Sequence, residues 1–228
     1  MIRAVLFDLG GTLDGPARHW ETRFGALYRR EGWQLSRGEL ADAFGHATRA
    51  AYADPAMASR CLRETVAFHS RHQLERLGRF DAEVVERVAG SFVAEAEAAL
   101  AASRAVLQRL RPLVRLGVIS NFYGNAERIL DDAGITPLLD VVIDSSCVGC
   151  SKPEPRIFEL ALDALRLAPA EVLYVGDSFD KDILPAHRLG LRTAWLVPVD
   201  APPCPEPDAA DFTLLRLEDV EGLVSVER

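Results

Sequence analysis

Residues 5–14 read Val-Leu-Phe-Asp-Leu-Gly-Gly-Thr-Leu-Asp. An apolar run typical of a buried strand ends at Asp8, and a glycine-rich turn follows at once. Open α/β sheets build their sites at the carboxyl ends of their strands, so Asp8 is predicted to lie in such a site. Position 10 carries Gly10, where a partner carboxylate for acid–base chemistry would be expected. This turn therefore carries Asp8 but lacks the second carboxylate that acid–base chemistry would need.

The length and composition of the chain are those of an ordinary globular protein. It has 228 residues, 49% hydrophobic and 26% charged, enough for one large domain or a core with an insertion. It has no run of about 18 apolar residues, and its first strand starts at Ile2, so neither a membrane span nor a signal peptide is expected. The formal charge of -8 argues against a nucleic-acid partner. We expect a cytoplasmic protein.

From about residue 100 onward, strand-like and helix-like segments alternate. Strands are predicted at 113–120, 140–144, 172–176 and 192–197, and helices at 124–133, 154–167, 180–189 and 214–224. Residues 198–208 are rich in proline and are predicted to form a loop. Repeated strand–helix units of this length predict an α/β fold, with a Rossmann-like parallel sheet covered by helices on both faces.

The segment that follows the first strand has a different pattern. Over residues 15–98, apolar residues such as Phe24 and Leu27 recur at helical spacing, and no convincing strand appears. This segment has 12 arginines, 12 acidic residues and no lysine. We therefore predict a core of residues 1–14 and 99–228 and a helical insertion of residues 15–98.

Four cysteines are present, and Cys147 and Cys150 form a C-x-x-C pair. A zinc site would need a second pair, but Cys61 and Cys204 are isolated in the sequence. A redox pair would be expected to open a helix after a strand. The pair is therefore interpreted as loop cysteines in a reducing compartment, with no assigned role.

Polar residues with complementary chemistry follow the predicted strands or lie in nearby loops. They are Asp8, Ser120, Asn121, Lys152 and Gly176-Asp177-Ser178, with Asp180 and Asp182 just beyond. A carboxylate can accept a phosphoryl group, while a hydroxyl, amides and a lysine balance the charge on the transferred oxygens. Acidic residues and a carbonyl can hold magnesium in an oxygen shell. The set indicates phosphoryl transfer.

Taken together, these segments resemble the haloacid dehalogenase superfamily, mostly its phosphatase branch. The resemblance covers residues 1–14 and about 100–225, and the four motifs in this order are specific as a set. It implies a HAD-like core with a helical cap, here residues 15–98, that closes over the substrate and sets specificity. It also implies a magnesium-dependent hydrolase of a small phosphorylated metabolite, acting as a monomer or homodimer.

The same resemblance implies roles for individual residues. Asp8 would be the nucleophile, and Lys152 the second catalytic residue. The phosphoryl group would be bound, or Asp8 oriented, by Thr12, Ser120, Asn121 and Lys152. Magnesium would be bound by Asp8, the Gly10 carbonyl and Asp177, with Asp182 supporting the metal shell.

The chain departs from the family pattern at Gly10. The phosphatases have Asp-x-Asp-Gly-Thr where this chain has Asp-Leu-Gly-Gly-Thr, and in them the second aspartate protonates the leaving group and then activates water. Loss of such a group costs about 10²–10⁴ in rate. A phosphatase without it would need a good leaving group, as in acyl phosphates, or another group such as Asp14 or His19. Asp14 is interpreted as a turn residue.

Other branches of the family differ at the same position. Dehalogenases need no metal and lack the acid of the Gly-Asp-Ser motif, which this chain keeps as Asp177. Phosphonoacetaldehyde hydrolases need a cap lysine for a Schiff base, and residues 15–100 contain none. Two alternatives to an active phosphatase stay open: a phosphate- or metal-binding protein with impaired catalysis and, less favoured, a 2-haloacid dehalogenase.

Overall fold

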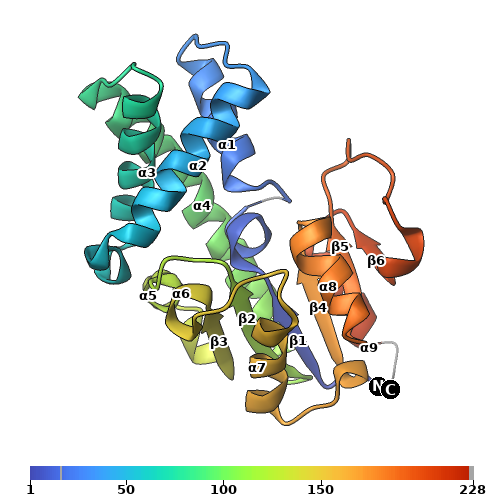
Figure 1. Ribbon diagram of the computed structural model, residues 1–228. Helices are drawn as coiled ribbons and strands as arrows, with labels where there is room; N and C mark the ends of the chain where they lie inside the picture. The colour runs from blue at the N-terminus through green and yellow to red at the C-terminus, as the bar shows by residue number, and fades with distance from the viewer. Residues whose placement is uncertain (16, 226–228) are drawn as a thin grey trace.

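The centre of the protein is a sheet of six parallel strands in the order β3-β2-β1-β4-β5-β6 (Figure 1). The computed structural model describes residues 1–15 and 17–225. The strands are β1 (Ala4–Phe7), β2 (Arg115–Ser120), β3 (Val141–Asp144), β4 (Val172–Gly176), β5 (Arg192–Leu196) and β6 (Phe212–Leu214). The strand order reverses direction at β1, so the carboxyl ends of β1, β2 and β4 form the kind of switch point where such sheets bind ligands.

Successive side chains of a strand point to opposite faces of the sheet, and in the central strands the side chains on both faces are apolar. Both faces of the sheet are therefore buried. One face is covered by α4 (Ala82–Leu110), α5 (Ala126–Asp132) and α9 (Val220–Ser225), and the other by α7 (Pro155–Leu165) and α8 (Leu184–Arg188). Val5 and Phe7 pack toward the first set, and Ala4 and Leu6 toward the second. The predicted Rossmann-like α/β architecture is confirmed.

The carboxyl-terminal segment corrects one prediction. A helix is predicted over residues 214–224, but Leu214 ends strand β6, and the only α-helix in this stretch is α9, which begins at Val220. β6 pairs with the edge strand β5, with Thr213 opposite Trp195. Its three residues are too few for a period of two to be recognised in the sequence.

The insertion contains helices and no strand among residues 15 and 17–98. Its α-helices are α1 (Trp20–Arg30), α2 (Arg37–Ala53), α3 (Leu62–Arg76) and the first part of α4. The remaining α-helix of the described chain, α6 (Ser145–Val148), belongs to the core and follows β3. The helix α4 is 29 residues long and continuous, so the predicted division between residues 98 and 99 falls inside it. The second part of α4 is tied to the core where Ser103 Oγ donates to the Leu13 carbonyl at 2.8 Å.

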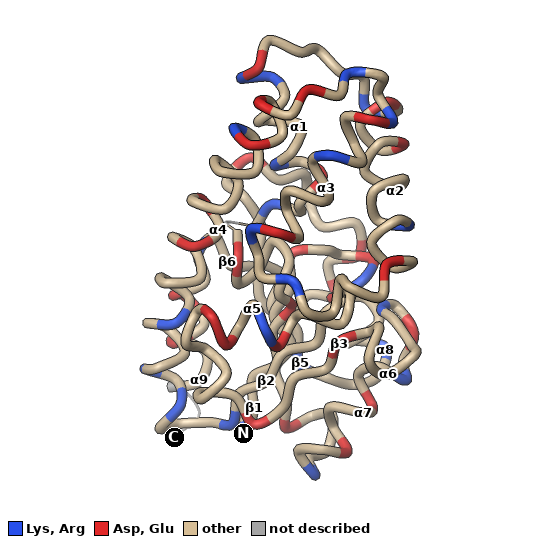
Figure 2. Tube along the Cα trace, turned by 90° about the vertical axis from the view of Figure 1, so that its left-hand side faces the viewer, with Lys and Arg blue, Asp and Glu red and all other residues tan. Residues whose placement is uncertain are grey.

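The helices of the insertion carry charged residues of both signs (Figure 2). Ion pairs join neighbouring helices, as between Arg30 and Glu95 and between Arg76 and Asp42. These pairs are exposed and therefore weak in water, so the insertion is held together mainly by its apolar interior. Within the described part of the chain, no helix combines the length and apolar character needed to cross a bilayer.

Candidate active site

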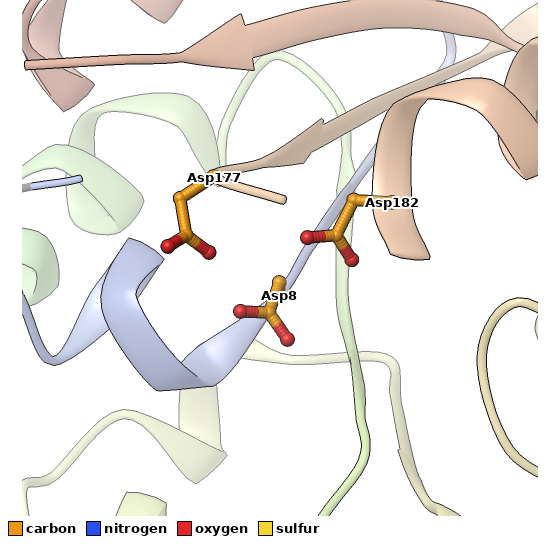
Figure 3. A group of neighbouring side chains, drawn as sticks. All are labelled: Asp8, Asp177 and Asp182. Carbon is orange, nitrogen blue, oxygen red and sulfur yellow. The ribbon is translucent and has the colours of Figure 1, made fainter. Parts of the chain in front are cut away.

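Three aspartates converge at the carboxyl ends of β1 and β4 (Figure 3). Asp8 follows β1, Asp177 follows β4, and Asp182 lies in the short helical segment Phe179–Ile183 beyond it. Phe7 and Val175 are partners in the two neighbouring strands, so the chain leaves both strands at the same level. One oxygen of each aspartate lies within 4.8 Å of the others. A cluster of carboxylate oxygens of this kind fits Mg²⁺.

Two glycines allow the aspartates to approach each other. Gly11 has a φ of 104°, which favours glycine, and a Cβ there would lie 2.5 Å from Asp177 Oδ2. A Cβ on Gly176 would lie 2.5 Å from the Cβ and Cγ of Asp182. Both glycines are therefore required by the packing of the site.

Lys152 is buried among the aspartates, with 4% of its surface exposed. Its Nζ lies 2.5 Å from Asp8 Oδ1, 2.6 Å from Asp182 Oδ1 and 3.1 Å from the Tyr174 hydroxyl. Asn121 fixes the loop that carries it: Asn121 Nδ2 donates to the Lys152 carbonyl at 2.8 Å, and the Lys152 amide donates to Asn121 Oδ1 at 2.7 Å. Asn121 thus positions Lys152 through its backbone.

The site holds more negative than positive charge. Burial raises the pKa of Asp8 to about 7, although the Lys152 ammonium opposes this. Burial and then the charge of Asp8 hold the pKa of Asp177 well above its usual range. Burial would lower the pKa of Lys152, but Asp182 and Asp8 outweigh it and keep the ammonium charged. A divalent cation beside Asp8 and Asp177 would offset the remaining repulsion.

A cavity of about 280 Å³ opens over this cluster. The predicted site residues that line it are Asp8, Gly10, Ser120, Asn121, Lys152, Asp177 and Asp182. Thr12 is not among the described lining residues. It is buried, and its hydroxyl donates to Asp177 Oδ1 at 3.4 Å, so it supports Asp177 from outside the cavity.

The carboxylate of Asp14 is fully engaged away from the cavity. Its Oδ1 accepts from the Gly11 amide at 2.7 Å, and its Oδ2 accepts from the Trp20 indole at 2.6 Å. Arg23 forms a buried ion pair with it at 3.4 Å. Asp14 therefore closes the turn after Asp8, as its interpretation as a turn residue predicts.

His19 does line the cavity. Its Nδ1 accepts the backbone N–H of Glu21 at 3.3 Å, which requires that nitrogen to be unprotonated. Burial, and next the charge of Lys181, lower the pKa of His19 to about 4. His19 is thus a neutral imidazole at neutral pH and offers no imidazolium proton.

Several aromatic residues at the site were not singled out from the sequence. Tyr174 lies inside β4 and contacts Lys152 and Asp182. The sequence feature that could have pointed to Tyr174 is its hydroxyl in an otherwise aliphatic buried strand, because a buried hydroxyl needs a polar partner. Trp195 in β5 donates its indole N–H to the Asp177 carbonyl at 3.0 Å. The cavity also has Phe44, Tyr52, Phe122 and Tyr123 in its lining, all unpredicted.

Lys152→Met is expected to lower the free energy of unfolding by about 3–5 kcal/mol, because it leaves two buried carboxylates without their cation. Denaturant unfolding measures this, with Lys181→Met as the control. Lys181 is the only other lysine of the chain and is exposed. Equal stability of the two variants would contradict the ion-pair network around Lys152.

The sequence of this chain is similar to those of known proteins. Residues 2–190 match the family model described as a haloacid dehalogenase-like hydrolase. Phosphoserine phosphatase of Thermus thermophilus is 31% identical over 214 residues, which covers 85% of this chain and 81% of that protein. Haloacid dehalogenase-like hydrolase domain-containing protein 3 of Bos taurus is 36% identical over 80 residues, 35% of this chain. That match spans only 32% of the bovine protein.

Two solved structures share the fold. The HAD-hydrolase YfnB of Bacillus subtilis, bound to magnesium, has a TM-score of 0.63 at 19% identity, with 99% of both chains covered. A dehalogenase has a TM-score of 0.67 at 18% identity, over 97% of this chain and 96% of its own. At such identities the likeness establishes the architecture alone. Because the family model matches most of its length, the chain belongs to the haloacid dehalogenase-like hydrolases.

Proposed function

We propose that this hydrolase is a magnesium-dependent phosphatase that acts on a small phosphorylated substrate through an aspartyl-phosphate at Asp8. The position of Asp8 carries the proposal. Its carboxylate lines the cavity, and it lies between the Lys152 ammonium, at 2.5 Å, and the carboxylate of Asp177. The phosphatase activity named for the Thermus thermophilus relative agrees with phosphoryl chemistry.

The residues around Asp8 suit the transfer of a phosphoryl group. An Asp8 oxygen attacks phosphorus as the bond to the leaving oxygen breaks, and water then hydrolyses the aspartyl-phosphate. Lys152 and Ser120 line the same cavity and supply a cation and a hydroxyl to the phosphoryl oxygens, and the side-chain amide of Asn121 holds Lys152 in place. Thr12 acts indirectly, because it orients Asp177.

Asp8, Asp177 and the Gly10 carbonyl would hold Mg²⁺. Support comes from the 4.8 Å grouping of the carboxylate oxygens and from the raised pKa values of Asp8 and Asp177. When bound, the ion would supply charge stabilisation to the phosphoryl oxygens.

Asp182 is satisfied by other partners within the protein. Its Oδ1 contacts Lys152 Nζ and the Tyr174 hydroxyl, and its Oδ2 accepts from the Ser178 amide at 3.0 Å. We therefore propose that Asp182 orients Lys152 beside the metal ligands, and thus supports the metal shell indirectly.

Mg²⁺ is expected to raise the melting temperature, because it binds the folded site and offsets repulsion there. At 100 times its Kd, it would add about 2.7 kcal/mol of stability. Thermal scans with Mg²⁺ and with EDTA measure the effect. Asp177→Asn should lose the shift, while Asp180→Asn, at an exposed position nearby, should keep it. A full shift in Asp177→Asn would contradict this metal site.

Release of phosphate from acetyl phosphate tests the function itself. Acetyl phosphate is small, and its leaving group needs no protonation, so Gly10 does not limit the transfer of the phosphoryl group to Asp8. We expect turnover that requires Mg²⁺ and stops with EDTA. Phosphate binding without turnover above an Asp8→Asn background would instead identify a binding protein. Halide release from 2-chloropropionate without Mg²⁺ would identify a dehalogenase.

A further inference from the structure

We propose that the substrate is an aryl phosphate: the phosphate monoester of a small phenol, whose ring lies against the aromatic side chains of the cavity and whose oxygen leaves as a phenolate. The inference rests on the proposed phosphatase function and adds its substrate class. It is carried by the aromatic residues of the cavity lining, by the lack of charge on the lining residues that the insertion supplies, and by the lack of a free carboxylic acid for the leaving group.

Aromatic side chains line the cavity beside the aspartates. Trp20, Phe44 and Tyr52 come from the insertion, and Phe122 and Tyr123 from the loop after β2. They meet edge to face between the two parts of the protein, with ring centroids 5.6 Å apart for Trp20 and Phe122 and 4.9 Å apart for Tyr52 and Tyr123. Phe122 directly follows Asn121, so this aromatic surface begins next to the proposed phosphoryl site. Such fixed rings favour an aromatic ligand.

The insertion adds no charge to the cavity at neutral pH. Its described lining residues are His19, Trp20, Phe44, Thr48 and Tyr52, and His19 is neutral. A phosphorylated amino acid would bring an ammonium and a carboxylate here. Lys181 of the core also lines the cavity and could pair with the carboxylate, but the insertion supplies no charged partner for the ammonium. Burying an unpaired charge is costly, whereas an uncharged ring needs no such partner.

Among the described lining residues, no carboxylic acid is free to protonate a leaving oxygen. The carboxylic acids there are Asp8, Asp177 and Asp182. They serve as the proposed nucleophile, the proposed metal ligand and the partner of Lys152. Gly10 has no side chain, and the Asp14 carboxylate is held by the Gly11 amide and the Trp20 indole. The leaving group must therefore depart without a proton from a carboxylic acid.

The acidity of the leaving group then decides which esters react. A phenol has a pKa of about 10, as in the tyrosine side chain. Aliphatic alcohols are closer to water, whose pKa is about 15.7. A phenolate thus leaves readily where an alkoxide would need a proton. The cavity volume of about 280 Å³ lies near the lower end of ligand pockets, about 300 Å³, which favours a single ring.

The proposed reaction is balanced with water as the co-substrate. An Asp8 oxygen forms a bond to phosphorus, the bond from phosphorus to the aryl oxygen breaks, and its electron pair leaves with the phenolate. The phenolate takes a proton from the solvent. Water then attacks phosphorus, the bond to Asp8 breaks, and inorganic phosphate leaves as the water loses its proton to the solvent.

Kinetics with phenyl phosphate and benzyl phosphate test the leaving-group argument. Both esters carry one phenyl ring, but benzyl phosphate releases an aliphatic alcohol. With Mg²⁺, kcat/KM for phenyl phosphate is expected to exceed that for benzyl phosphate by about 10²-fold or more, the scale of one acid–base group. Gly10→Asp should lower the ratio of kcat/KM for phenyl phosphate to that for benzyl phosphate, and Gly10→Asn should leave this ratio unchanged. Equal wild-type rates would overturn the proposal.

The ring contact is tested with Tyr52→Ala. The ratio of kcat/KM for phenyl phosphate to that for acetyl phosphate should fall by about 2–10-fold, the scale of one aromatic contact. Tyr52 is 49% exposed, so its truncation leaves the interior intact. The control is Phe80→Ala, at a residue that is also 49% exposed but does not line the cavity. An unchanged ratio in Tyr52→Ala would overturn the proposal.

Acetyl phosphate separates this proposal from the function on which it rests. If the wild type hydrolyses no phosphate ester or acetyl phosphate faster than Asp8→Asn does, the phosphatase function itself fails. If acetyl phosphate is hydrolysed but phenyl phosphate has no advantage over benzyl phosphate, only the aryl-phosphate assignment fails.

Discussion

Asp8→Asn is expected to lower kcat/KM for acetyl phosphate by about 10⁴-fold or more, the scale seen when a catalytic nucleophile is removed. An amide does not form the acyl phosphate, and it also removes one negative ligand of the proposed metal. The fold should survive, because Asn has the shape of Asp and the Lys152 ammonium keeps Asp182 as its partner at 2.6 Å.

Asp180→Asn is the matched control for this prediction. It makes the same chemical change at an exposed aspartate near the site, outside the cavity lining. Phosphate release at saturating Mg²⁺ measures both variants, and circular dichroism checks that they are folded. An Asp8→Asn protein that kept more than a few per cent of wild-type turnover would show that Asp8 is not the nucleophile.

Gly10→Asp is expected to raise kcat/KM for benzyl phosphate by about 10²–10⁴-fold, because it supplies the missing acid and base. The backbone conformation of Gly10 and the space around it allow this substitution. Gly10 has φ -79° and ψ 95°, so its φ suits a residue with a side chain. A Cβ there would lie 3.8 Å from the nearest atoms, which belong to the Trp20 indole, and this is ordinary van der Waals contact.

Gly10→Asn controls for shape, since it adds the same bulk with no acid. Steady-state kinetics on the wild type and the two variants separate acid–base catalysis from a change in packing. If Gly10→Asp gave no gain while the wild type turned over benzyl phosphate well, another group would be supplying the proton. The ammonium of Lys181, which also lines the cavity, would then be the first group to test.

The fold and the main elements of the site could be predicted because they depend on short stretches of sequence. Apolar runs that end in Asp8 and in Gly176-Asp177 mark two strands and the edge where they finish. Parallel strands bring those ends together, so side chains more than 160 residues apart meet without any further information. The helical insertion follows from periodicity alone.

Contacts that form only through space could not be predicted. Thr12 is predicted to bind the phosphoryl group or to orient Asp8, and the sequence gives no sign of the contact that its hydroxyl makes with Asp177 Oδ1. The hydroxyl of Tyr174 in a buried strand indicates that it needs a polar partner, but the sequence does not identify that partner as Lys152. The aromatic lining combines residues from the insertion and from the loop after β2, and only tertiary packing brings these together.

Acid-quenched mass spectrometry during turnover of acetyl phosphate with Mg²⁺ tests the aspartyl-phosphate at Asp8 most directly. Because Gly10 offers no base to activate water, the intermediate should break down slowly and accumulate. We predict a phosphoryl group on the peptide that contains Asp8, lost in Asp8→Asn. Steady phosphate release from an enzyme whose Asp8 peptide stays unmodified would contradict the mechanism.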